Sequence, residues 1–197
     1  MVWDEFGSTE PRRDEGFTLV EVLVAIVIIA IIALGLAQMF VLAMRTNQAA
    51  RHQTSATILA AQKMEQLRSL TWGYDDDGLG LPVSDTTTNL SVQPMASTGN
   101  GLSPSPASAL DQNTPGYVDY LDARGNWVGT GAAAPPTAVY IRRWSIRPLP
   151  TNPNDTLVLQ VLVTTVMREI QVAGVGGARV RYADDALIAT VKTRKAK

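Results

Sequence analysis

The chain has 197 residues and a formal net charge of −1, with 46% hydrophobic and 18% charged residues. This balance excludes a global basic field for nucleic acid, and the length allows one domain with or without a membrane segment. Because the sequence contains no cysteine and only one histidine, disulfides, thiolate metal sites and cysteine nucleophiles are excluded and a structural zinc site is disfavoured.

An almost unbroken apolar run dominates the N-terminal part of the sequence. It extends from Val22 to Met44 without a charged residue, and Gln38 is its only strongly polar side chain. At about 1.5 Å per residue, a helix of this length is comparable to the hydrocarbon core of a bilayer, roughly 30 Å. The run is too long for a cleavable signal peptide, whose apolar region has about 7–15 residues. We therefore expect a transmembrane helix over residues 17–44.

The helical pattern continues beyond the apolar run. No proline occurs between Phe17 and Leu81, and Gly73 supplies a stop signal. Apolar residues at helical spacing predict one buried face, made of Ala56, Leu59, Ala60, Met64, Leu67 and Leu70. The sequence therefore predicts a stem helix over residues 45–72. His52 lies on this stem, and we expect it to contact solvent or another subunit.

Residues 73–116 have the composition of a loop. Within them, Asp75, Asp76 and Asp77 are weak candidates for a calcium site, because calcium prefers oxygen ligands. Three adjacent aspartates cannot all point at one ion, so a solvated turn is the simpler explanation. We expect no cofactor and keep calcium as the alternative.

Residues 117–197 have the pattern of an antiparallel sheet. Strands are predicted at residues 117–121, 127–128, 139–149, 156–166 and 186–193, with a turn over 148–154. Asp119, Asp122 and Asn126 form a second, weaker calcium candidate, for which hairpin-turn chemistry is the simpler explanation. The predicted fold is α+β: a long N-terminal helix, apolar in its membrane half and amphipathic in its stem, packed on a small antiparallel β headpiece.

Basic residues in the headpiece are candidates for a nucleic-acid site. Arg142, Arg143 and Trp144 are weak candidates, because arginine pairs with phosphate and tryptophan stacks on bases. Charges on the exposed face of a strand are the simpler explanation, so DNA binding is not expected. We likewise expect a solvated terminus for the basic residues of the tail, Lys192, Arg194, Lys195 and Lys197.

The segment Gly16-Phe17-Thr18-Leu19-Val20-Glu21 places one carboxylate at the start of the apolar run. A charge at membrane depth costs on the order of 2.5–3.5 kcal/mol, so Glu21 needs a partner. This segment and the apolar helix behind it resemble the class III signal of type IV pilins and type II secretion pseudopilins. Residues 62–68 resemble the end of the stem helix in minor pilins of the PilV kind.

The resemblance implies how the chain would be processed and used. Prepilin peptidase would remove a leader, residues 1–16, by cutting between Gly16 and Phe17, and the new amino group of Phe17 would be N-methylated. Glu21 would pair with the Phe17 amine, most usefully that of a neighbouring subunit. The implied partners are other pilin subunits through their N-terminal helices, membrane lipid and the inner-membrane assembly platform. The chain would sit in the bacterial inner membrane with a periplasmic headpiece, and then in a pilus at the cell surface.

Two features depart from the usual pilin pattern. The leader contains Arg12 and Arg13 but also five acidic residues, whereas pilin leaders are usually basic. The cysteine pair of many major pilins is absent, which favours a minor pilin. No nucleophile–base set, P-loop or dinucleotide fingerprint is found, so we expect no enzyme.

We therefore predict a structural minor pilin of the PilV kind, in or at the tip of a type IV pilus. The first alternative is a minor pseudopilin of a type II secretion system, but the headpiece is larger than in small pseudopilins. A second is a single-pass anchored binding module that never polymerises, which predicts that Glu21→Ala changes little. A third is a DNA-uptake receptor, which predicts salt-dependent binding that is lost when Arg142 and Arg143 are neutralised.

Overall fold

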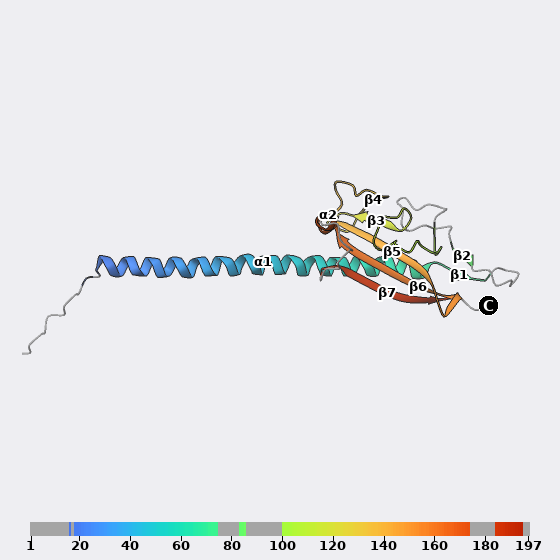
Figure 1. The fold of residues 1–197 in the computed structure, drawn as a ribbon, viewed down its shortest axis with the longest axis horizontal. Helices are drawn as coiled ribbons and strands as arrows, with labels where there is room; N and C mark the ends of the chain where they lie inside the picture. The colour runs from blue at the N-terminus through green and yellow to red at the C-terminus, as the bar shows by residue number, and fades with distance from the viewer. Residues whose placement is uncertain (1–15, 17, 75–82, 86–99, 174–183, 195–197) are drawn as a thin grey trace, which may run out of the picture. The chain divides into compact units, whose positions relative to one another are not determined.

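The structure is a computed structural model that describes residues 16, 18–74, 83–85, 100–173 and 184–194, with the side chains of residues 170–173 left out of the description. It divides into two compact units, Met1–Thr46 and Asn47–Lys197. The elements are α1 (Leu19–Ser69), β1 (Trp72–Gly73), β2 (Val83–Ser84), β3 (Val118–Leu121), β4 (Trp127–Thr130), β5 (Tyr140–Leu149), β6 (Asn152–Thr165), α2 (Val166–Ala173) and β7 (Ala186–Thr193) (Figure 1).

Helix α1 begins with a side-chain cap. The hydroxyl of Thr18 accepts a hydrogen bond from the backbone N–H of Glu21 at 3.2 Å, and the Thr18 carbonyl accepts one from the N–H of Val22 at 3.2 Å. Threonine is a preferred N-cap because its oxygen satisfies one of the unpaired N–H groups at a helix start. The cap explains why the helix begins at Leu19, two residues later than predicted.

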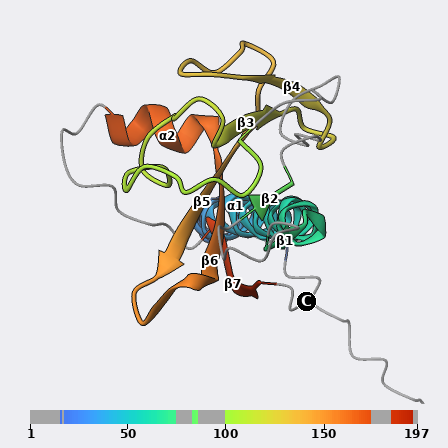
Figure 2. The ribbon, with the colours of Figure 1, turned by 90° about the vertical axis from the view of Figure 1, so that its right-hand side faces the viewer.

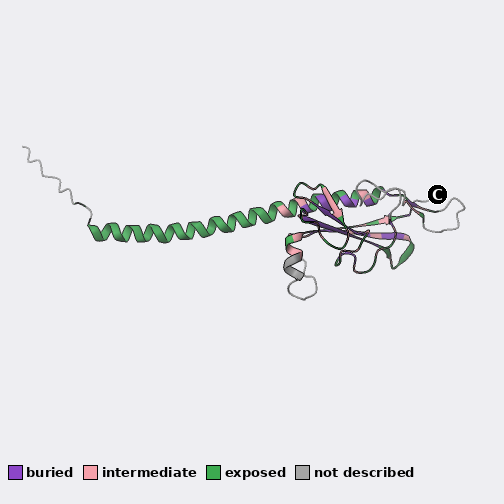
Figure 3. Cartoon of the chain, turned by 90° about the horizontal axis from the view of Figure 1, so that it is seen from above, coloured by how far each residue is buried: buried purple, intermediate pink, exposed green. Residues whose placement is uncertain are grey.

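The described residues of the N-terminal unit are Gly16, Thr18 and residues 19–46 of α1, and all of them are exposed. By length and composition, α1 is the one helix among the described residues that could cross a membrane. Figure 3 shows how burial along α1 is confined to its C-terminal part.

The C-terminal unit holds a five-stranded antiparallel sheet with the order β4-β3-β5-β6-β7. Strands β5 and β6 form its longest pairing, from Tyr140 opposite Thr165 to Leu149 opposite Asn152. One face of the sheet packs on the C-terminal part of α1 (Figure 2). The predicted fold class, a long apolar helix packed on an antiparallel sheet in a pilin-like α+β arrangement, is confirmed.

The core between α1 and the sheet contains the whole predicted apolar stripe. All six residues, Ala56, Leu59, Ala60, Met64, Leu67 and Leu70, are at most 8% exposed. They pack against aromatic and aliphatic residues of the sheet, including Tyr140, Trp144 and Leu159. A smaller cluster covers the opposite face, where Val118, Tyr120 and Ile141 pack with the start of α2. The sheet is therefore covered on both faces near β3 and β5.

Helix α2, strand β6 and the short strands β1 and β2 differ from the prediction. Helix α2 was not predicted, because the apolar residues of β6 continue into it without a turn signal. Strand β6 begins at Asn152 inside the predicted turn, because the chain reverses direction within two residues. The register of β5 and β6 shifts by a bulge between Pro148 and Leu149. The predicted loop region contains the two-residue strands β1 and β2, which pair antiparallel. Strand β7 has the bounds that the sequence predicted.

Candidate functional site

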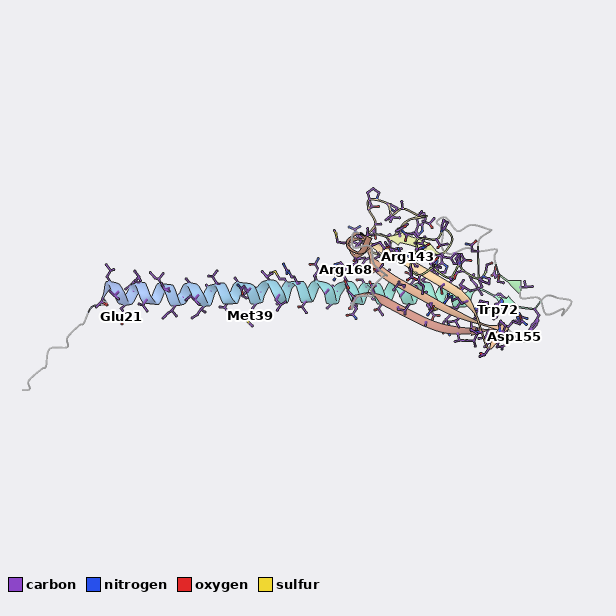
Figure 4. The ribbon with its side chains drawn as sticks, in the orientation of Figure 1. Glu21, Met39, Trp72, Arg143, Asp155 and Arg168 are labelled. Carbon is purple, nitrogen blue, oxygen red and sulfur yellow. The ribbon has the colours of Figure 1, made fainter. Side chains whose placement is uncertain are left out.

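The signal segment surrounds the start of α1. Gly16 is exposed, and a Cβ built on it would meet no atom within 4 Å. Phe17 lies outside the described residues. Glu21 is in the first helical turn, where the helix dipole favours a negative charge. Within the described part of the chain, no hydrogen bond or ion pair reaches its carboxylate, which is labelled in Figure 4.

A charged cluster is buried between α1 and the sheet. The carboxylate of Asp119 on β3 is 0% exposed, and the guanidinium of Arg142 on β5 binds both of its oxygens. The distances are 2.8 Å from Nε to Oδ1 and 2.7 Å from Nη2 to Oδ2. Asp119 and Arg142 stand directly opposite each other in the register of β3 and β5. Arg142 also donates from Nη1 to the carbonyl of Leu59 on α1 at 3.2 Å.

Lys63 brings a second cation from α1 into the same cluster. It is 1% exposed, and its Nζ lies 3.6 Å from Asp119 Oδ2 and 3.8 Å from the centroid of the Trp144 ring. Burial lowers the pKa of Lys63 to about 7, and the Asp119 carboxylate, which raises it, offsets only part of that effect. Lys63 is not among the predicted site residues, although it stands four residues after Leu59 on the predicted apolar stripe.

Arg143 points to the opposite face of the sheet. Its guanidinium donates from both Nε and Nη2 to Asn113 Oδ1 and pairs with Glu169 of α2 at 2.8 Å. Burial lowers the pKa of Arg143 to about 10. The expectation that Arg142 and Arg143 lie on an exposed face is therefore wrong, because both faces are covered. At 4%, 0% and 2% exposure, Arg142, Arg143 and Trp144 have no surface with which to bind DNA.

The basic end of the chain is also partly built into the fold. The ammonium of Lys192 donates to two carbonyls at the end of α1, Arg68 O at 2.6 Å and Leu70 O at 2.5 Å. A cation is favoured there by the helix dipole. The expectation of a solvated terminus is wrong for Lys192, and Lys195 and Lys197 lie outside the described residues.

Arg194 is held at the same end of the sheet. Its guanidinium carbon lies 4.1 Å from the centroid of the Tyr74 ring and 5.2 Å from that of Trp72. It pairs with Asp155 at 3.5 Å, and Asp155 accepts a hydrogen bond from the Tyr74 hydroxyl at 2.7 Å. Figure 4 labels Trp72 and Asp155, two of the residues that Arg194 contacts. The prediction of a solvated side chain is therefore wrong for Arg194 as well.

The calcium candidate at Asp119, Asp122 and Asn126 has its side chains bonded within the protein. Asp122 accepts hydrogen bonds from the N–H groups of Arg124 and Asn126, each at 2.8 Å, and from the Asn126 side chain at 3.0 Å. These bonds to Asn126 lower the pKa of Asp122. Hairpin-turn chemistry is confirmed for this pair but is wrong for Asp119, which belongs to the buried cluster. Asp75, Asp76 and Asp77 lie outside the described residues, among which no group of acidic or histidine side chains could hold a metal ion.

His52 finds a partner within the chain. Its Nδ1 lies 3.1 Å from the hydroxyl of Tyr140 on β5, and the two rings meet edge to face with centroids 6.0 Å apart. We had expected solvent or another subunit at this position.

A comparison with protein families matches residues 11–37 to the prokaryotic N-terminal methylation motif. The chain carries a prepilin-type methylation signal. The motif implies processing by prepilin peptidase, and with the pilin-like fold it indicates the membrane-anchored precursor of a type IV pilin or pseudopilin. The match ends within the apolar part of α1. No curated protein and no solved structure matches the chain.

Proposed function

We propose that the chain is a structural minor pilin of a type IV pilus, of the PilV kind. In this proposal prepilin peptidase cuts after Gly16, and the new amino group of Phe17 is N-methylated. The observation that carries the proposal is the position of Glu21, an exposed carboxylate in the first turn of an exposed apolar helix, inside the matched motif.

The exposed apolar surface supports an assembly role. Leu19 to Met44 present large apolar side chains at 47–82% exposure, which is unfavourable in water. Lipid of the inner membrane covers this surface before assembly, and the N-terminal helices of other pilin subunits cover it in the filament. Cleavage creates an ammonium at Phe17, four residues from Glu21, and pairing the two offsets the cost of burying either charge alone. The C-terminal unit is periplasmic at first and lies on the outside of the pilus afterwards.

The N-terminus of the mature protein tests the proposal. We expect mass spectrometry to find N-methyl-Phe17 in cells with prepilin peptidase, and the uncut chain in cells that lack the peptidase. Gly16→Val should stay uncut, because a branched side chain obstructs approach to the backbone. Gly35→Ala is the matched control, since a Cβ there also meets no atom within 4 Å, and it should be cut normally. An uncut chain in wild-type cells would refute the proposal.

A second experiment addresses assembly. Glu21→Gln should be cut and inserted in the membrane but be lost from sheared pili, while Gln38→Leu, which changes a polar residue farther along the apolar run, should be retained. Equal recovery of both variants in pili would contradict the role of Glu21. A cut protein that is absent from pili and is needed for secretion would favour the minor pseudopilin. Full function of Glu21→Gln without any filament would favour the anchored module.

A further inference from the structure

The buried cluster between α1 and the sheet holds more positive than negative charge. Lys63, Asp119 and Arg142 are 1%, 0% and 4% exposed, so two cations share one carboxylate away from water. Arg142 already takes both oxygens of that carboxylate. Lys63 reaches it only at 3.6 Å, which is longer than a hydrogen bond. The ammonium is therefore the least well-partnered charge in the cluster.

Of the three groups, Lys63 is the one that can give up its charge at modest cost. A guanidinium keeps its protons at all relevant pH values. The Asp119 carboxylate is bonded through both of its oxygens by Arg142, a charge-assisted bidentate pair. A buried lysine, in contrast, is readily deprotonated, and loss of its proton leaves one cation facing one anion. The neutral amine still packs against the face of Trp144.

We propose that Lys63 makes the docking of α1 on the sheet sensitive to pH, so that the interface holds more tightly once Lys63 has lost its proton. The cluster ties α1 to β3 and β5 at once, because Arg142 also bonds the Leu59 carbonyl. A proton on Lys63 therefore weakens the contact by which the C-terminal part of α1 is held. This inference stands independently of the proposed function.

The direction of the pH dependence follows from the pKa of Lys63. In the unfolded chain Lys63 keeps its ordinary pKa of 10.5, whereas burial lowers it to about 7 in the folded state. Between these values the unfolded chain binds more protons, so the stability of the folded state rises with pH. Below about pH 7 both states are protonated and this contribution is constant. The charged groups that face Lys63 are Asp119 from β3 and Arg142 from β5.

Amide hydrogen exchange of the full chain in detergent micelles tests the proposal. After correction for intrinsic exchange rates, protection of the amides in residues 56–67 should rise about tenfold between pH 6 and pH 8. Lys63→Met should remove that rise. Arg51→Met, which removes an exposed cation of the same helix, should keep it. His52→Gln should also keep it, which separates Lys63 from the His52–Tyr140 pair on the same interface.

An equal rise in wild type and Lys63→Met would overturn the proposal. The proposal would also be overturned if protection in Lys63→Met differed from wild type by the same factor at every pH. That result would assign Lys63 a packing role only. A second measurement, carbon NMR of the lysine Cε atoms, uses the wild-type chain and does not depend on a substituted variant folding. One lysine should titrate near pH 7, well below the others, whereas titration of every lysine above pH 9 would also overturn the proposal.

Discussion

Replacement of Asp119 by Asn is the sharpest test of the buried cluster. The substitution keeps the shape of the side chain but removes the one negative charge that faces Arg142 and Lys63. Because Asp119 is fully buried and bound through both oxygens, its loss leaves buried cations uncompensated. Breaking a buried ion pair in this way typically costs about 3–5 kcal/mol, a large part of the roughly 5–15 kcal/mol that stabilises a domain.

The magnitude should itself depend on pH. At pH 6 Lys63 is protonated, so Asp119→Asn removes the partner of two cations; at pH 8 most Lys63 is neutral and mainly Arg142 loses its partner. We therefore expect a larger loss of stability at pH 6 than at pH 8.

Urea unfolding of the full chain in mild detergent, followed by tryptophan fluorescence, measures this loss directly. Glu65→Gln is the matched control, because it also turns a carboxylate of an ion pair into an amide. Glu65 and its partner Arg68 are 69% and 55% exposed, so that change should cost less than about 0.5 kcal/mol. If Asp119→Asn costs no more than Glu65→Gln, the cluster does not hold the desolvated charges that its geometry requires.

Three further substitutions probe separate contacts of the C-terminal unit. Lys192→Met should lower stability by about 1 kcal/mol in the same urea assay, because two carbonyls at the end of α1 lose a charged donor. Gly125→Ala should lower it by about 1–2 kcal/mol, since φ is +83° and the new Cβ would lie 2.9 Å from Leu59 Cδ2. Tyr140→Phe should cost about 0.5–1.5 kcal/mol and shift the imidazole NMR signals of His52; unchanged signals would contradict the hydrogen bond.

The long helix and its buried stripe could be predicted because helical burial repeats along the sequence. Lys63 shares that period, four residues after Leu59, but a lysine on an apolar stripe has no recognisable partner until the sheet is in place. Its partners Asp119 and Arg142 lie far along the chain and meet only through the register of β3 and β5. Local patterns predict which face of a helix is covered, and they do not identify the distant charges that meet it.

The paired arginines show a different limit. Arg142 and Arg143 are adjacent on β5, so their side chains point to opposite faces of the sheet. They could both be exposed only if neither face were covered there, yet α1 covers one face and α2 begins on the other. Because α2 follows β6 without a turn signal, no sequence pattern indicated that a helix covers the second face. Since α2 was not predicted, its residue Glu169 was not predicted as the partner of Arg143 either.

Two carboxylates of this chain, Glu21 and Asp119, occur in apolar surroundings, and they differ in whether the described residues supply a counter-charge. Asp119 is supplied with cations from two other elements of its own unit. Glu21 stands on an apolar helix, and among the described residues no cation pairs with it. A carboxylate buried in lipid or between helices is costly without a counter-charge. The fold therefore supplies the counter-charges of Asp119, whereas Glu21 needs a positive charge that the described residues do not provide. In the proposed function, cleavage between Gly16 and Phe17 creates that charge four residues away, and this is how the proposal links the methylation motif to assembly.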